Sequence, residues 1–162
     1  MRINATRLFG AAAVLPVAAV AAALVTQHVF GMQPCPWCVL QRVIFMALSL
    51  AALLGLVGSK LRIRAVRGTA AILMLALAAC GVAAALWQHF VAAASQSCNL
   101  TLADRVVGAT GLDAAFPQVF AAYASCADAA ARLLGVPYEF YSLTLFVGLG
   151  ATAAWLLWCR GA

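Results

Sequence analysis

The residues best suited to chemistry are two cysteines near the start of the chain, in the motif Cys35-Pro-Trp-Cys38-Val-Leu-Gln-Arg42. Two thiols separated by two residues close a small disulfide and reopen it, so this spacing is typical of a redox pair. A loop this small adds little stability by restricting the unfolded chain, so a purely structural disulfide explains it poorly. We therefore expect Cys35 and Cys38 to take part in thiol–disulfide exchange.

Arg42 follows Cys38 by four residues, about one helical turn. If a helix begins near Cys38, the two side chains share one face of it. A guanidinium at that place stabilises a Cys38 thiolate and, equally, an anionic reduced acceptor beside it. The alternative interpretation is that Arg42 only anchors the end of the helix at a membrane interface.

The other four of the six cysteines divide into two kinds by their surroundings. Cys98 and Cys126 lie in a long polar segment, whereas Cys80 and Cys159 lie in apolar runs, where we interpret them as inert apolar residues. Because the first two cysteines pair locally, Cys98 and Cys126 are left as a second pair. Two structural disulfides and a four-cysteine zinc site are the alternatives. Zinc is disfavoured, because the second pair is not another Cys-x-x-Cys, and we expect no metal.

Composition places the chain in a membrane. It is 67% hydrophobic and only 9% charged, where an ordinary soluble domain has roughly 25% charged residues. Apolar runs occupy residues 8–30, 39–58, 69–94 and 140–158, about the length that crosses a bilayer. We predict one all-α membrane domain over residues 1–162, a four-transmembrane-helix bundle. A cleavable signal peptide is the alternative for the first run.

The placement of charge predicts the orientation of this bundle. Seven of the ten basic residues lie at the N-terminus, in the turn at residues 59–68 and at the C-terminus: Arg2, Arg7, Lys60, Arg62, Arg64, Arg67 and Arg160. All four acidic residues lie in the segment 95–139. The positive-inside rule makes the basic side cytoplasmic and leaves the loops 31–38 and 95–139 outside. The net charge of +6 is thus a topology signal, and we expect no nucleic-acid partner.

The second outer loop is predicted to carry a short interfacial helix from Pro117 to Leu134. Apolar residues recur there at helical spacing, and Gly135 and Pro137 supply a stop. The stripe consists of Phe116, Phe120, Tyr123, Ala127, Ala130 and Leu134. On this helix Cys126 lies beside the stripe, which holds it near the membrane surface where Cys35 and Cys38 also lie. Packing of the stripe onto the other helices is an equally good interpretation.

The pattern resembles the DsbB family of quinone-dependent thiol oxidases over nearly the whole chain. Four spans, a Cys-x-x-Cys in the first outer loop and a spaced cysteine pair in the second carry the resemblance. Its most specific part is the stretch from Cys35 to Arg42, whose Gln-Arg ending matches the motif of that family better than a bare Cys-x-x-Cys could. The resemblance implies that a DsbA-like periplasmic thioredoxin-fold protein forms a mixed disulfide with Cys98. Electrons then pass to Cys35 and Cys38, and from Cys38 to a bound ubiquinone close to Arg42, with menaquinone as the alternative acceptor.

The resemblance also implies a multi-pass protein of the bacterial inner membrane, with both termini cytoplasmic and the cysteine loops periplasmic. It points to His89 as a hydrogen-bond partner of a quinone carbonyl, although a lone histidine there also serves as a polar anchor. The alternatives are a paralogue dedicated to another periplasmic thiol partner and a non-enzymatic membrane protein with structural disulfides. A reductase of the vitamin K epoxide type is disfavoured, because that family carries its Cys-x-x-Cys late in the chain.

Overall fold

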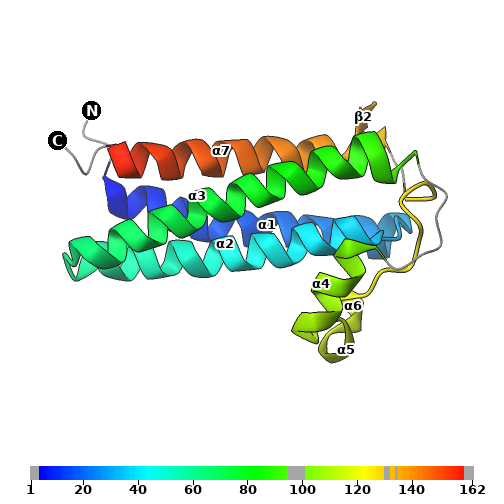
Figure 1. Ribbon diagram of the computed structural model, residues 1–162, viewed down its shortest axis with the longest axis horizontal. Coiled ribbons are helices and arrows are strands. Elements are labelled where there is room, and N and C mark those ends of the chain that lie inside the picture. The colour runs from blue at the N-terminus through cyan, green and yellow to red at the C-terminus, as the bar shows by residue number, and fades with distance from the viewer. Residues whose placement is uncertain (1–3, 95–100, 130–131, 134, 159–162) are drawn as a thin grey trace.

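The computed structural model describes residues 4–94, 101–129, 132–133 and 135–158 of the chain. Within these residues four long helices lie side by side (Figure 1): α1 (Ala5–Phe30), α2 (Pro36–Lys60), α3 (Arg64–Trp87) and α7 (Tyr138–Trp158). Each is long and apolar enough to cross a membrane, α3 together with the π-helix η1 (Gln88–Ala92) that continues it. The predicted all-α, four-helix membrane architecture is confirmed.

The helices begin earlier than the apolar runs, and in α1 and α2 the first turn is supported by residues suited to a helix N-terminus. Asn4 caps α1, its side-chain oxygen accepting the N–H of Thr6 at 3.1 Å. Pro36 opens α2 at the first helical position, where the fixed φ of proline fits and its missing N–H has no partner to lose. α3 begins at Arg64 rather than at residue 69, so residues 61–63 alone separate it from α2.

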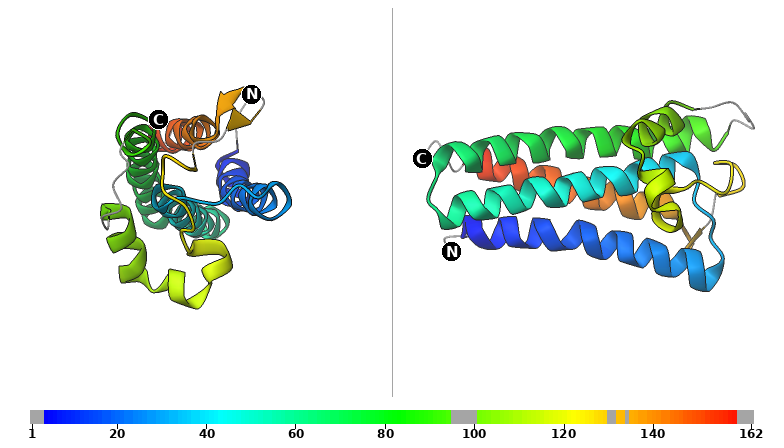
Figure 2. Two further views of the ribbon diagram at one scale, coloured as in Figure 1. Left: turned by 90° about the vertical axis from the view of Figure 1, so that its right-hand side faces the viewer. Right: turned by 90° about the horizontal axis from the view of Figure 1, so that it is seen from below.

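The connections divide between the two ends of the bundle. The start of α1, the end of α7 and the α2–α3 turn lie at one end (Figure 1). At the opposite end lie the α1–α2 connection and three short helices, α4 (Leu102–Thr110), α5 (Leu112–Ala115) and α6 (Pro117–Phe120). Figure 2 shows these helices as a lobe on one side of the bundle, where α4 and α6 pack against α2.

The helix predicted over residues 117–134 is confirmed only for Pro117–Phe120 and is wrong over residues 121–129 and 132–133; residues 130, 131 and 134 lie outside the described part of the chain. The chain turns extended at Ala121, and the N–H groups of Tyr123 and Ala124 donate to the carbonyl of Pro34 at 3.0 and 3.3 Å instead of to their own segment. β1 (Arg132–Leu133) and β2 (Val136–Pro137) follow as a two-residue antiparallel ladder. The lobe's longest helix is instead α4, where Thr101 and Asp104 form a reciprocal capping box.

The core is centred on α2, which packs along both α1 and α3. In turn, α3 packs along α7. Contacts between α1 and α7 are far fewer, so this side of the bundle is the loosest. The rings of Phe45 and Phe146 stack with centroids 4.1 Å apart and join α2 to α7 through the centre. Gly81 of α3 lies against the Phe146 ring so closely that a Cβ there would overlap it. A glycine is thus required at this crossing.

We predict that Gly81→Ala destabilises the protein, because Phe146 is fully buried and stacked and has no room to move. Overpacking of this kind costs about 1–3 kcal/mol. The thermal unfolding midpoint of the detergent-solubilised protein should fall by roughly 2–4 °C per kcal/mol lost. The matched control is Gly148→Ala in α7, where no atom lies within 4 Å of the added Cβ. Equal midpoints for the two variants would contradict the packing argument.

Candidate redox site

The Cys-x-x-Cys pair forms the N-terminus of α2. Cys35 occupies the N-cap position in an extended conformation, and its sulfur accepts the N–H of Cys38 at 3.3 Å. The two Sγ atoms lie 2.9 Å apart. Cys35 is fully buried, whereas Cys38 is partly exposed. A helix N-terminus presents unpaired N–H groups and a positive dipole end, so this position suits cysteines that must carry negative charge during exchange.

Cys126 is brought to the same place by the second outer loop. The loop crosses over the first one through the two hydrogen bonds to the Pro34 carbonyl, and the backbone N–H of Trp37 donates to the Cys126 sulfur. Contact with Cys126 raises the pKa of the Cys35 thiol, and Cys38 and burial add to this effect. The same contact lowers the pKa of Cys126. Three of the four predicted cysteines therefore meet in one cluster.

Cys98, the fourth predicted cysteine, lies outside the described residues. Its disulfide with Cys126 therefore stays a prediction.

Arg42 is buried, and its guanidinium is directed to the second loop rather than to Cys38. Its Nη1 donates to Gln27 Oε1 in α1 at 2.9 Å and to the carbonyl of Val119 in α6 at 2.7 Å. Gln27 in turn donates to the carbonyl of Gln118 at 3.3 Å. We call Arg42, Gln27 and the carbonyls of residues 118–119 the loop clamp. It joins α1 and α2 to the segment that leads to Cys126.

A cavity of about 210 Å³ lies beneath these residues, between the outer halves of α1, α2 and α7. Its walls are apolar on the α1 side, where Ala19, Val20 and Ala23 line it. Its polar end is formed by Cys38, Gln41, Arg42, Gln88, Thr26, Tyr138, Glu139, Tyr141 and Ser142. The Cys38 thiol and a guanidinium thus line a mostly apolar cavity, which suits a flat, weakly polar ring that accepts hydrogen bonds or charge.

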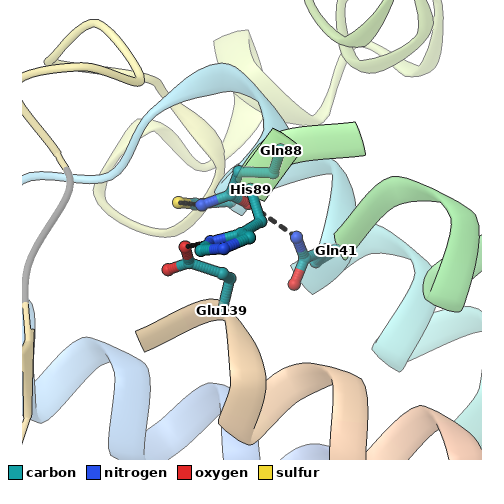
Figure 3. Close-up of polar contacts among 5 residues, drawn as sticks. Gln41, Gln88, His89 and Glu139 are labelled. Atoms are coloured by element: carbon teal, nitrogen blue, oxygen red, sulfur yellow. Dashed lines mark hydrogen bonds and ion pairs between the residues drawn. The ribbon is translucent and has the colours of Figure 1, made fainter. Parts of the chain in front are cut away.

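Gln88 and Gln41 also belong to the site, although neither was predicted from the sequence to have a role. Gln88 Nε2 donates to Cys38 Sγ at 3.2 Å, and Gln41 Nε2 donates to Gln88 Oε1 at 2.7 Å (Figure 3). Gln88 is the first residue of η1, and π-helical turns are frequent at functional sites. The position of Gln41 one helical turn beyond Cys38 could have indicated its role from the sequence. The role of Gln88 could not be found in this way, because it approaches Cys38 from a different helix.

His89 lies behind the cavity wall and does not line it. Its Nδ1 contacts Glu139 Oε1 at 2.6 Å, and Figure 3 shows the imidazole facing this carboxylate. Glu139 does line the cavity. The His89 side chain is 32% exposed and that of Glu139 only 10%, so the pair joins the outer surface to the cavity. From the sequence, Glu139 was interpreted only as one of the acidic residues that indicate the orientation of the bundle.

Four membrane-length helices with clustered cysteines at one end define a multi-pass membrane protein for thiol–disulfide exchange. A family model described as "Disulfide bond formation protein DsbB" matches residues 5–156. Disulfide bond formation protein B of Aromatoleum aromaticum is 36% identical over 123 residues, 74% of this chain and 72% of that protein. The protein of the same name from Ralstonia nicotianae is 31% identical over 160 residues, covering 94% and 93%. The chain therefore belongs to the DsbB family, with a disulfide oxidoreductase role.

We predict that Gln27→Ala loosens the second loop, because it removes one acceptor of Arg42 and one donor to α6. Amide hydrogen exchange at Tyr123 and Ala124 should become about tenfold faster, the equivalent of one lost hydrogen bond. Gln118→Ala is the matched control, since Gln118 is exposed and contributes only its backbone carbonyl. Identical exchange in both variants would show that the clamp does not hold the loop.

Proposed function

We propose that the protein is a thiol:quinone oxidoreductase that reoxidises a DsbA-like periplasmic dithiol protein and passes the electrons to a quinone. The observation that carries this proposal is the continuity of the site. Cys126 lies against Cys35, Cys35 contacts Cys38, and Cys38 lines an apolar cavity together with Arg42. An electron pair that enters at the outer loop has a path of touching sulfur atoms to the cavity.

The first part of the relay uses the outer loop. A thiolate of the partner attacks a Cys98–Cys126 disulfide at Cys98, and Cys126 leaves as a thiolate. The lowered pKa of Cys126, caused mainly by its contact with Cys35, makes it a good leaving group. The second thiol of the partner then attacks the mixed disulfide, so that the partner departs oxidised and Cys98 is released as a thiolate.

The second part of the relay moves the electron pair inward. Cys126 Sγ attacks Cys35 Sγ of a Cys35–Cys38 disulfide, forming a Cys35–Cys126 bond and releasing Cys38 as a thiolate. Cys98 then attacks Cys126, which restores the Cys98–Cys126 disulfide and leaves Cys35 reduced. The contact between Cys35 and Cys126 supports this order, because it makes Cys35 the sulfur that the loop reaches first.

The cavity fits a quinone ring, which when bound accepts two electrons and two protons from the reduced pair. Cys38 and Arg42 would hold that ring at the polar end of the cavity. A groove of about 640 Å³ between α1 and α7 shares Tyr141 and Leu145 with the cavity and continues along apolar side chains. It suits the isoprenoid tail of ubiquinone or menaquinone.

His89 and Glu139 form a hydrogen bond at the wall of this cavity, between Nδ1 and Oε1. The proton in this bond is exchanged with the surrounding solution through the partly exposed imidazole. We therefore assign His89 to proton supply through Glu139, rather than to direct contact with the ring.

The orientation follows the basic residues. Basic residues lie at the start of α1 and at the α2–α3 turn, the end of the bundle opposite to Cys35 and Cys38 at the start of α2 (Figure 1): Arg7, Lys60, Arg62, Arg64 and Arg67. By the positive-inside rule this end is cytoplasmic, so that both termini lie inside a bacterial inner membrane and the cysteines face the periplasm.

The proposal is tested by mixing the purified protein with reduced DsbA and a soluble ubiquinone analogue and following quinone reduction. Cys38→Ser and Cys126→Ser should each abolish turnover, because each interrupts the chain of exchanges. Cys80→Ser is the control, since Cys80 lies exposed on α3 away from the cluster and should leave the rate unchanged. Disulfides that are only structural would give no turnover with the natural sequence.

Arg42→Ala should raise the apparent KM for the quinone analogue about tenfold, the effect of losing one charge-assisted hydrogen bond. A single turnover of DsbA oxidation without added quinone should keep its rate. Gln27→Ala serves as the comparison, because it loosens the loop clamp but keeps the guanidinium at the cavity. If Gln27→Ala raises the KM as much as Arg42→Ala does, Arg42 acts only through the loop.

A further inference from the structure

Cys38 has a hydrogen-bond donor that the proposed relay leaves without a role. Its Sγ accepts from Gln88 Nε2 at 3.2 Å, across the interface between α2 and the π-helical end of α3. The guanidinium of Arg42, which the sequence suggested would stabilise this sulfur, donates hydrogen bonds to Gln27 and Val119 instead. The neutral amide is therefore the side chain placed to bind the sulfur directly.

The orientation of the Gln88 amide is enforced by a second glutamine. Gln41 Nε2 donates to Gln88 Oε1 at 2.7 Å, so the oxygen of Gln88 is occupied and its NH₂ group is left to face the sulfur (Figure 3). A thiolate only accepts hydrogen bonds, so this orientation matches the ionised form of Cys38. Gln41 and Gln88 are 3% and 7% exposed, and little water reaches them to compete for these bonds.

We propose that Gln88 is a catalytic residue of this site, which binds the Cys38 thiolate through its amide, and that Gln41 positions it. In the proposed relay Cys38 is the leaving thiolate of the inner exchange, so a donor at its sulfur lowers the barrier to its release. The inference deepens the proposed function and rests on Cys38 being the inner cysteine of the relay. The chemistry recognised is a thiolate, so it does not depend on which quinone is bound.

Several other charged or titratable groups surround the Cys38 sulfur and act on it together with Gln88. They are Cys35 at the helix cap, Cys126 in the loop, Arg42 on α2, and Tyr138, Glu139 and Tyr141 on α7. Among the residues that line the cavity, α1 contributes none that titrates. The test must therefore change Gln88 and Gln41 while it keeps these groups in place.

The experiment measures the pH dependence of Cys38 alkylation by iodoacetamide in the full-length, quinone-free protein, reduced beforehand and freed of the reductant so that Cys38 and Cys126 are both thiols. A Cys35→Ser background makes Cys38 the only thiol of its pair, and peptide-resolved mass spectrometry reports Cys38 and Cys126 separately. Gln88→Met keeps the length of the side chain and removes its donor. The midpoint of the Cys38 profile should move about one pH unit upward, and that of Cys126 should stay in place.

Two further variants test the chain of bonds. Gln41→Met should move the Cys38 midpoint in the same direction by less, because Gln88 keeps its donor but loses its fixed orientation. Gln88→Glu should move it at least as far as Gln88→Met, since a carboxylate donates no hydrogen bond and repels the thiolate. Gln88→Glu also tests the proposal if Gln88→Met fails to fold. Ser49→Ala is the control: it removes a buried hydrogen bond of α2 to the Ala13 carbonyl, three turns from Cys38.

Unchanged Cys38 midpoints in Gln88→Met and Gln88→Glu would overturn the proposal. So would an equal shift in Ser49→Ala, which would trace the effect to general loosening. A change in alkylation rate at all pH values alike, with the midpoint fixed, would assign Gln88 a structural role only. Because neither quinone nor partner protein is present, these outcomes are independent of the turnover assay that tests the proposed function.

Discussion

A buried guanidinium must find hydrogen-bond acceptors, and the acceptors that Arg42 finds organise the outer end of this protein. An unpaired charge at that depth would cost several kcal/mol. Arg42 meets the requirement with the Gln27 side chain and the Val119 carbonyl, and so ties α6 to the two helices beneath it. The loop clamp and the hydrogen bonds to the Pro34 carbonyl then bring Cys126 against Cys35. The approach of Cys126 to Cys35 therefore follows from the hydrogen bonds that one buried charge requires.

Different side chains around Cys38 make different interactions. Arg42 holds the loop and faces the cavity, Gln88 faces the sulfur, and Glu139 with His89 closes the remaining wall. These groups come from three helices that converge at the outer end of the bundle. Deeper in the bundle, packing relies on small and aromatic residues such as Gly81 and Phe146, because spans facing lipid gain cohesion from close contact rather than from polar groups. The sparse contact between α1 and α7 leaves room for the cavity.

The family, the four spans and the cysteine motif were all accessible in the sequence. Each depends on local patterns in the sequence: runs of about 20 apolar residues, basic residues in the connections on one side of the spans, and two thiols at fixed spacing. The placement of Cys35 at a helix cap also follows from the motif, since Pro36 marks the first turn. The helix predicted at 117–134 was wrong because its periodicity competed with hydrogen bonds from Tyr123 and Ala124 to a distant carbonyl, which the pattern does not record.

By itself the sequence determined that this is a membrane protein with a Cys-x-x-Cys motif at one end of its spans, because length, hydropathy and spacing are properties of single segments. Tertiary structure alone decided which side chains serve the cysteines. Gln88 reaches Cys38 across a helix interface, and Arg42 turns to the loop because acceptors from α1 and α6 lie there. His89 meets Glu139 rather than the cavity for the same reason. These partners are separated by 15 to 77 residues along the chain, and only the packing of the helices brings them within hydrogen-bonding distance.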